Sequence, residues 1–506
     1  MAPRSRIKAA TAVAALVMLA SACGSTAQMT STAAAGAGGD GLTPAGATPQ
    51  ASSGPTTPSG AVTGSTGGST GGATGTTYPG SGGATGTVTL PVNSGPTVAA
   101  NQPIQLGFVL TSTTSVSAAG YSSGETYSEQ QVDTALVNAM NAHGGIAGHK
   151  IVPVFAKTDP NSTSWSTDFA AACSALTEDH HVIAVLGYQF NYDQGFEACL
   201  TKKGIPHLTT GFNIPDNLEL AQHPLHRALA VPTIDHRSLA KLEGGWQDGL
   251  LTSKSIVGIA IDGCPGTHDS WNRVAKPWLV SHKIKYVLQD GTSCSDGNNA
   301  GAASGVNEVP NALLQMRRQG VDTIMLLSVS EGPALIVVAS AAEAQKWYPR
   351  YIVSSLGNLS ALEGNKAVIP QDQLANVVGY GWMPAQDLDP ALQPARTPSQ
   401  TRCLQLLKSQ QIKPANFGDF TNAYRLCDAV FAYEAAVEKV SGDVSGAAVI
   451  RGLDALGTSF DNPDVLDGAT QFGPGRANIA PAHMHQVIWN KACSCFNYHG
   501  ATRPLP

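Results

Sequence analysis

The stretch Asn141–Asp159, which reads Asn-Ala-His-Gly-Gly-Ile-Ala-Gly-His-Lys-Ile-Val-Pro-Val-Phe-Ala-Lys-Thr-Asp, decides the predicted fold. Apolar residues within 135–140 form the stripe of a helix, and the glycines that follow can adopt the positive φ that ends one. A β-forming run, Ile151–Phe155, comes next and is stopped by Asp159-Pro160. With the apolar run Ile104–Leu110 as the preceding strand, this order is typical of a parallel βαβ unit in an α/β fold.

The residue identities in this stretch are more specific than its pattern. Asn141-Ala-x-Gly-Gly-Ile-x-Gly-x-Lys150, a strand and then Asp159 together resemble the signature of type I periplasmic solute-binding proteins, the group of the branched-chain amino-acid binding proteins. Matching segments continue at Val185-Leu186-Gly187 and Gly204-Ile205-Pro206. The resemblance covers roughly residues 103–495. It implies two doubly wound, Rossmann-like lobes joined by a hinge of several strands.

The first residues predict export. Basic residues precede an apolar core, Ala9–Ala20, that is too short to span a bilayer as a mature helix. The segment Ala20-Ser21-Ala22-Cys23 resembles a bacterial lipobox. Residues 1–22 are therefore predicted to be a lipoprotein signal peptide, with Cys23 lipidated at the cell membrane. An ordinary secretory signal followed by a chance cysteine is the alternative, and it exports the chain as well.

A low-complexity segment, residues 23–102, follows the signal peptide. It consists mainly of Gly, Ser, Thr, Ala and Pro and cannot bury enough apolar surface to offset its ordering entropy, so we expect a disordered tether. About 400 residues then remain, which is more than one core usually serves. We expect lobe one to comprise 103–231 plus about 384–460, and lobe two 232–383 plus about 461–506.

Composition and motifs argue against other classes of protein. The formal net charge is −6 and no basic patch is interleaved with aromatic residues, so nucleic acid is not an expected partner. The glycine-rich segment Gly263-Cys-Pro-Gly266 lacks the lysine of a phosphate-binding loop, no GxSxG nucleophile elbow directly follows a predicted strand, and HExxH does not occur. We therefore expect a monomeric, non-enzymatic protein without a cofactor or metal.

Cysteine usage agrees with export. Nine cysteines occur, and eight remain when Cys23 is set aside, an even number that suggests disulfides in an exported chain. Many pairings are open, and joining sequence neighbours is the simplest choice; the resemblance also implies the first pair. The expected pairs are Cys173–Cys199, Cys264–Cys294 and Cys403–Cys427. Cys493 and Cys495 are left unassigned, because a bridge across one residue is usually strained.

Ligands of doubly wound proteins bind at the carboxyl ends of parallel strands. Here those ends lead into loops rich in Ser, Thr, Asn and Tyr, which suits a hydrogen-bonding site closed between two lobes. Tyr188 or Phe190 would stack on the ligand and Glu331 would meet a ligand cation, although core and helix-cap roles are the alternatives. The predicted contacts are Thr111, Ser112, Thr113, Tyr188, Gln189, Phe190, Asn191, Thr209, Thr210 and Gly211 in lobe one, and Asp262, Asp269, Ser330, Glu331 and Asn358 in lobe two.

The resemblance implies an extracytoplasmic solute-binding lipoprotein that delivers a small polar ligand, such as an amino acid or amide, to an ABC permease. In relatives, small hydroxyl residues after the glycine equivalent to Gly187 hold the ligand carboxylate, whereas this chain has Tyr188–Asn191. The resemblance therefore does not specify an α-amino acid. A sensory receptor module of the same fold is the first alternative, and a neighbouring permease gene would argue against it. An enzyme is the second, and turnover of a metabolite would reveal it.

Overall fold

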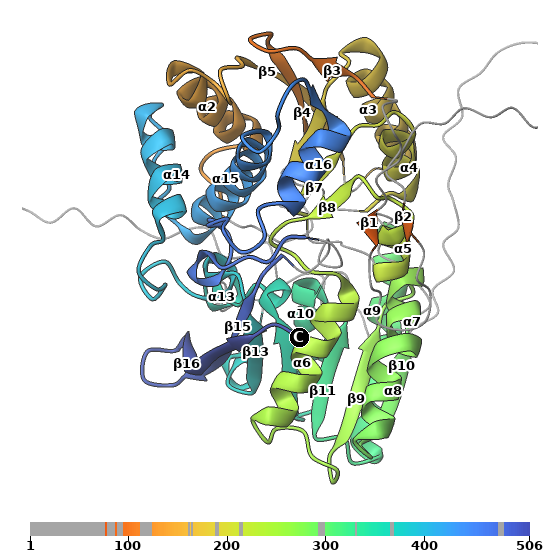
Figure 1. Cartoon of the computed structure of the whole chain (residues 1–506). Coiled ribbons are helices and arrows are strands. Elements are labelled where there is room, and N and C mark those ends of the chain that lie inside the picture. The colour runs from red at the N-terminus through yellow and green to blue at the C-terminus, as the bar shows by residue number, and fades with distance from the viewer. Residues whose placement is uncertain are drawn as a thin grey trace, which may run out of the picture. The chain divides into compact units, whose positions relative to one another are not determined.

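Two mostly parallel sheets carry the fold in the computed structural model of the chain (Figure 1). The structure describes residues 95–111, 124–159, 162, 165–187, 192–211, 216–291, 299–328, 331–364, 369–473 and 480–506, and the strand segments 76–77 and 87–88. All of these lie in the second of the two units into which the chain divides, residues 71–506. No helix among them is both long and apolar enough to cross a bilayer.

The first sheet has five parallel strands in the order β5-β4-β6-β7-β8. They are β4 (Ile104–Thr111), β5 (Ile151–Thr158), β6 (Ala184–Gly187), β7 (His207–Thr209) and β8 (His226–Ala228). Their register sets Ile104 beside Ile151 and Val185 beside His207. Apolar runs in the sequence predict β4 to β7, and the structure confirms them. The sequence does not predict β8, because its residues His-Arg-Ala carry no apolar pattern.

Helices cover both faces of this sheet, as expected for a doubly wound lobe. Alternation along β4 turns Leu106 and Phe108 toward a core shared with α2 and α14 to α16, whereas Val109 packs with α3 and α4 on the other face. The helices are α2 (Glu129–Ala142), α3 (Trp165–Ser174) with its π-helical continuation η1 (Ala175–Asp179), α4 (Gln194–Lys202), α14 (Pro398–Ser409), α15 (Phe417–Val437) and α16 (Gly446–Asp454).

The signature stretch is a tight corner between α2 and β5. The side chain of Asn141 accepts a hydrogen bond from the Ile151 amide and donates one to the Ile151 carbonyl, both at 2.8 Å. Gly145 has φ of +81°, and a Cβ there would lie 1.9 Å from the His149 carbonyl oxygen. Lys150 Nζ donates to the Asn141 carbonyl at the end of the helix. The asparagine, glycine and lysine of the signature thus fasten one helix end to the next strand.

The second sheet has seven strands in the order β10-β9-β11-β12-β13-β15-β16. They are β9 (Ile256–Ile261), β10 (Lys285–Asp290), β11 (Thr323–Leu327), β12 (Arg350–Ser354), β13 (Val377–Gly381), β15 (His483–Asn490) and β16 (Cys495–Pro504). Strands β9 to β13 are parallel, and β15 and β16 add an antiparallel hairpin at one edge.

Helices also cover both faces of the second sheet. Val257 and Ile259 of β9 pack with α6, η2 and α8 on one face, whereas Ile324 and Leu326 of β11 pack with α9, α10 and α11 on the other. The helices are α6 (Ile234–Gln247), α7 (Pro265–Ser270), η2 (Trp271–Ala275), α8 (Lys276–Ser281), α9 (Asn299–Arg318), α10 (Glu331–Ala344), η3 (Ser355–Gly357), α11 (Leu359–Gly364) and α12 (Gln371–Leu374).

The chain passes between the two sheets after β8, after β13 and after α16. Short helix α13 (Pro384–Asp387) follows β13, and its Ala385 carbonyl accepts hydrogen bonds from Thr421 of α15 (3.3 Å) and Ser360 of α11 (3.0 Å). The last passage runs beside it, because the Leu466 amide donates to the Trp382 carbonyl at 2.7 Å. The lobe limits expected near residues 231, 384 and 460 fall in these passages, and they remain our proposal.

Part of the expected tether belongs to the folded unit. Strand β3 (Thr97–Val98) pairs antiparallel with β14 (Val444–Ser445), and Val98 packs against the core of the first sheet. Farther upstream, β1 (Thr76–Thr77) pairs with β2 (Thr87–Val88). The predicted tether, which was expected to reach residue 102, therefore extends too far at its C-terminal end. The predicted signal peptide and Cys23 lie outside the described residues.

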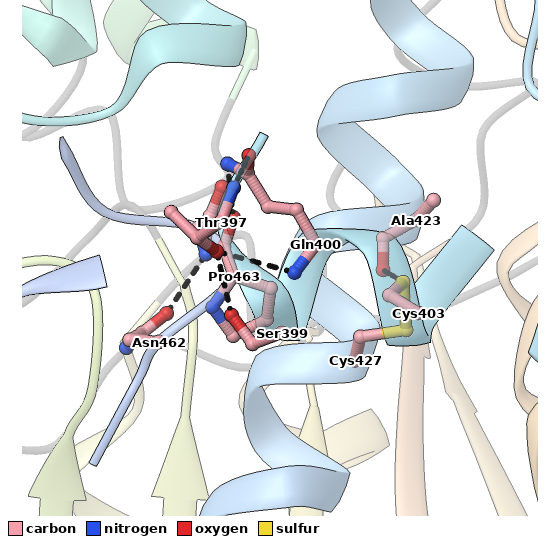
Figure 2. Close-up of a disulfide and its surroundings, with 9 residues drawn as sticks. Thr397, Ser399, Gln400, Cys403, Ala423, Cys427, Asn462 and Pro463 are labelled. Atoms are coloured by element: carbon pink, nitrogen blue, oxygen red, sulfur yellow. Dashed lines mark hydrogen bonds between the residues drawn. A yellow bond between two sulfur atoms is a disulfide. The ribbon is translucent and has the colours of Figure 1, made fainter. Parts of the chain in front are cut away.

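Disulfides tie neighbouring helices together on each face of the first sheet. Cys173–Cys199 joins α3 to α4, and Cys403–Cys427 joins α14 to α15; both are pairs expected from the sequence. Figure 2 shows the second bridge beside the start of α14, where Gln400 Nε2 donates to the Pro463 carbonyl at 2.9 Å. That bond links α14 to the last passage between the sheets.

Three further cysteines of the described residues lie in the second sheet and its loops. Cys493 and Cys495, which the sequence leaves unassigned, form a disulfide in the turn between β15 and β16. Ser494 between them has φ of +53°. Cys264 is disulfide-bonded, whereas Cys294, its expected partner, lies outside the described residues.

Candidate functional site

Four of the predicted ligand contacts, Thr111, Thr209, Thr210 and Gly211, lie at the carboxyl edge of the first sheet. Thr111 ends β4 and Thr209 ends β7, and β6 lies between them, so two strand spacings, about 10 Å, separate the two strands. Phe108 is level with Leu208 in the register of the sheet, so Thr111 also lies two residues farther along than Thr209. Thr209 Oγ1 accepts a hydrogen bond from the Gly211 amide at 3.0 Å. The hydroxyls of Thr111 and Thr210 are buried and have no hydrogen-bond partner among the described residues. Buried hydroxyls are normally satisfied, so these two are suited to a ligand or water.

The other lobe-one contacts are not part of the described structure. The same holds for one predicted contact of lobe two. Seven predicted contacts therefore remain predictions, and they are Ser112, Thr113, Tyr188, Gln189, Phe190, Asn191 and Ser330.

The lobe-two contacts are spread along the edge of the second sheet. Asp262 follows β9, and its Oδ1 accepts a hydrogen bond from the Cys264 amide at 3.1 Å. Asp269 is exposed on α7. Asn358 ends η3 with φ of +49°, a conformation that asparagine tolerates better than most residues, and its side chain is nearly buried. Asp262 and Asn358 therefore have local structural roles alongside any contact with a ligand.

Glu331 is held inside the protein by an internal cation. Its side chain is 1 % exposed, and Oε1 lies 2.6 Å from Lys241 Nζ, which is equally buried. Its Oε2 accepts hydrogen bonds from the amide (2.6 Å) and hydroxyl (2.8 Å) of Ser354. In the structure Glu331 therefore pairs with Lys241, and not with a ligand cation as the sequence predicts. Lys241 also donates a hydrogen bond to the Leu326 carbonyl. Burial lowers the pKa of Lys241, and Glu331 opposes that shift.

Several buried carboxyl groups that the sequence did not single out lie where the chain passes between the sheets. Asp387 of α13, Asp428 of α15 and Asp464 of the last passage are each at most 1 % exposed. Burial raises the pKa of Asp387 and of Asp464 to about 7 in each case, and that of Asp428 well above its usual range. Arg425 opposes the shift at Asp464 and Asp428, and Tyr498 donates a hydrogen bond to Asp387 at 3.0 Å.

A second group of buried polar residues lies on the first sheet beneath α4. Glu197 Oε1 lies 2.8 Å from His207 Nδ1, and Oε2 lies 2.9 Å from His226 Nδ1. All three side chains are 1 % exposed. Burial alone would raise the pKa of Glu197, but the two imidazoles hold it well below its usual range. Sequence reasoning missed this group because its members come from α4, β7 and the unpredicted β8.

No protein-family model and no curated protein sequence matches the chain. Solved structures do match it. A possible leucine/isoleucine/valine-binding protein from Rhodopirellula baltica is 12 % identical with a TM-score of 0.56, over 79 % of this chain and 97 % of that one. A branched-chain amino acid ABC transporter protein from Thermus thermophilus with bound valine is 12 % identical, with a TM-score of 0.58, over 80 % of this chain and 96 % of that one.

The chain has the fold of type I periplasmic binding proteins. A further structure with this fold is a solute-binding protein of an ABC transporter from Rhodopseudomonas palustris in complex with p-hydroxybenzoic acid. It is 14 % identical, with a TM-score of 0.58, over 80 % of this chain and 97 % of that one. At such low identity the likeness shows how the backbone is arranged, which confirms the predicted α/β fold class, and it does not specify side-chain contacts.

Proposed function

We propose that the chain belongs to the type I periplasmic solute-binding family and is an extracytoplasmic binding protein that delivers a small molecule to an ABC permease. The observation that carries this proposal is the fold, because it is shared with a possible leucine/isoleucine/valine-binding protein and with two ABC transporter proteins. One of those two has bound valine, and the other is in complex with p-hydroxybenzoic acid. Two lobes joined by several passages can hinge, and a ligand that contacts both favours the closed form. No catalytic role forms part of the proposal.

The carboxyl edge of the first sheet supports the placement of the ligand. Thr111 and Thr210 offer buried hydroxyls without partners among the described residues, and they follow strands of one sheet. Doubly wound sheets bind ligands at this edge. Because the neighbours bind chemically different molecules, the fold leaves the ligand open, and we propose a small polar molecule such as an amino acid or amide. Screening the full chain by thermal shift against amino acids, amides, ureas and sugars tests this function.

Aromatic anchors at the predicted loop should contribute much of the affinity. Once a ligand is identified, we expect Tyr188→Ala or Phe190→Ala to weaken binding by about 30-fold, because losing an aromatic anchor commonly costs at least about 2 kcal/mol. Isothermal titration calorimetry measures the change. Tyr348→Ala is the matched control, since Tyr348 is exposed and lies just before the amino end of β12, away from the carboxyl ends of the strands. If both loop variants bind within a factor of about two of wild type, the ligand site lies elsewhere.

Membrane anchoring through Cys23 is the second part of the proposal. The small residues before Cys23 and the apolar core before them support lipidation. We expect Cys23→Ala to appear in the medium or to remain unprocessed, whereas wild type fractionates with the membrane. Fractionation followed by mass spectrometry of the N-terminus distinguishes the two. A processed Cys23→Ala protein that stays on the membrane would contradict the assignment.

A further inference from the structure

Three residues of types that bind transition metals converge from separate elements beneath the first turn of α4. Glu197 comes from α4, His207 begins β7 and His226 begins β8. One possible ligand atom of each lies within 4.8 Å of the others. The parallel pairing of β7 with β8 sets the two histidines directly beside each other. The backbone of the sheet therefore fixes the spacing of the imidazoles, and the helix supplies the carboxylate.

We propose that Glu197, His207 and His226 form a site for a zinc ion. Two imidazoles and one carboxylate are a recurrent zinc ligand set, with a fourth position left for water. The nitrogen-to-oxygen separations of 2.8 and 2.9 Å are shorter than the edge of a tetrahedral zinc site, which is about 3.3 Å for ligand distances of about 2.0–2.1 Å. The ligands would need to move apart by only about half an ångström.

Charge balance favours a cation at this position over hydrogen bonds alone. Within the described part of the chain, Glu197 has only the two imidazoles as ion-pair partners. A buried carboxylate without a full countercharge is costly. Nε2 of both histidines is also buried without a hydrogen-bond partner among the described residues. A metal ion held by two neutral imidazoles would supply the countercharge of Glu197, so that neither buried histidine needs a proton.

The surroundings would hold the ligands in place. The rings of Phe196 and His207 meet edge to face with centroids 5.7 Å apart, and the rings of His207 and His226 are 5.1 Å apart. Tyr192 packs near His226 and donates a hydrogen bond to Glu219 at 3.1 Å. Helix α4 follows the predicted ligand loop, and β7 leads into Thr209, so a metal here would fasten two segments of the ligand edge to each other.

The test uses the full chain, produced without a histidine tag, unfolded with chelator and refolded with or without zinc. We expect about one zinc per chain by elemental mass spectrometry after desalting, and a higher melting temperature when zinc is present. His207→Gln and His226→Gln should each reduce the retained zinc at least about tenfold. His149→Gln is the matched control, because His149 is a buried histidine of the same lobe bound to the Gln102 carbonyl, and it should retain zinc like wild type.

Two results would overturn the proposal. In the first, wild type refolded with zinc retains less than about a tenth of an equivalent and melts at the same temperature as the zinc-free sample. The three residues would then form a hydrogen-bonded network only. In the second, His207→Gln and His226→Gln fold and retain as much zinc as wild type, which would place the metal elsewhere. Cobalt absorption spectra of the refolded chain add a readout that a purely structural histidine would not change.

Discussion

Lys241→Met should lower the free energy of unfolding by about 3–5 kcal/mol. Lys241 and Glu331 are each 1 % exposed and lie 2.6 Å apart, so removing the lysine leaves a carboxylate buried without its cation. The apolar replacement itself is tolerated, because methionine resembles the lysine stem in length. Urea unfolding followed by circular dichroism measures the change. Replacing both partners, as in Lys241→Met with Glu331→Met, should recover part of the loss, because the carboxylate that lost its cation is also removed. The buried Arg237 then keeps Asp262 and Asp235 as the carboxylates that favour its charge.

An exposed ion pair in the same lobe provides the matched control. Lys346 Nζ also lies 2.6 Å from a glutamate, Glu343, but the lysine side chain is 74 % exposed. We expect Lys346→Met to change the free energy of unfolding by less than about 1 kcal/mol, because solvent screens such a pair. If Lys241→Met and Lys346→Met lowered the free energy of unfolding equally, burial of the Lys241 pair would not be the cause of its contribution to stability.

The Lys241 pair also relates to the proposed ligand edge. Glu331 accepts hydrogen bonds from Ser354, the last residue of β12, and η3 with Asn358 begins at the next residue. The glutamate therefore supports this edge from inside instead of facing the ligand. The free energy of unfolding of Glu331 variants should therefore be measured first. A loss of ligand affinity in Glu331→Ala would not show that Glu331 contacts the ligand.

The sequence predicts those elements whose residues carry an apolar pattern. Strand β4 and helix α2 follow this rule, because burial on one or both faces sets their residue types. The three-residue strand β8 carries no such pattern; it is held by pairing with β7 and by the contact of His226 with Glu197. The sequence does not predict helix α14, because most of its residues are polar and two of its four buried residues are Ser399 and Gln400.

Only those site residues that end a predicted strand could be placed from the sequence. Thr111 and Thr209 end strands, so their positions follow from the fold. The role of Glu331 could not be predicted, because its partner Lys241 is 90 residues away along the chain and sits in a helix whose surroundings the sequence does not reveal. The buried acids Asp428 and Asp464 were missed for the same reason, since their burial depends on packing between distant segments.

Asp464→Asn should stabilise the ligand-free protein at pH 8 by roughly 2–4 kcal/mol. The pKa of Asp464 is about 7 in the folded protein, against the ordinary aspartate value of 3.8. Between those pH values the folded carboxyl keeps a proton that the unfolded chain has released. The stabilisation from this group is therefore complete below about pH 4, falls by about 1.4 kcal/mol per pH unit, and is lost by about pH 7. Asparagine has no proton to lose, so its contribution does not fall.

The pH profile separates this effect from a general gain in stability. Urea unfolding at pH 5, 6, 7 and 8 should give a slope for Asp464→Asn that is shallower than wild type by about 1.4 kcal/mol per pH unit between pH 5 and 7. Asp387 also has a pKa of about 7, so it accounts for a slope that remains in the variant. Asp428 and Arg425 are the other charged groups near Asp464. Asp443→Asn, on an exposed loop, should leave the profile unchanged. An unaltered slope in Asp464→Asn would mean that this carboxyl is ionised in the folded protein, which would require water or a cation within the passages that join the two lobes.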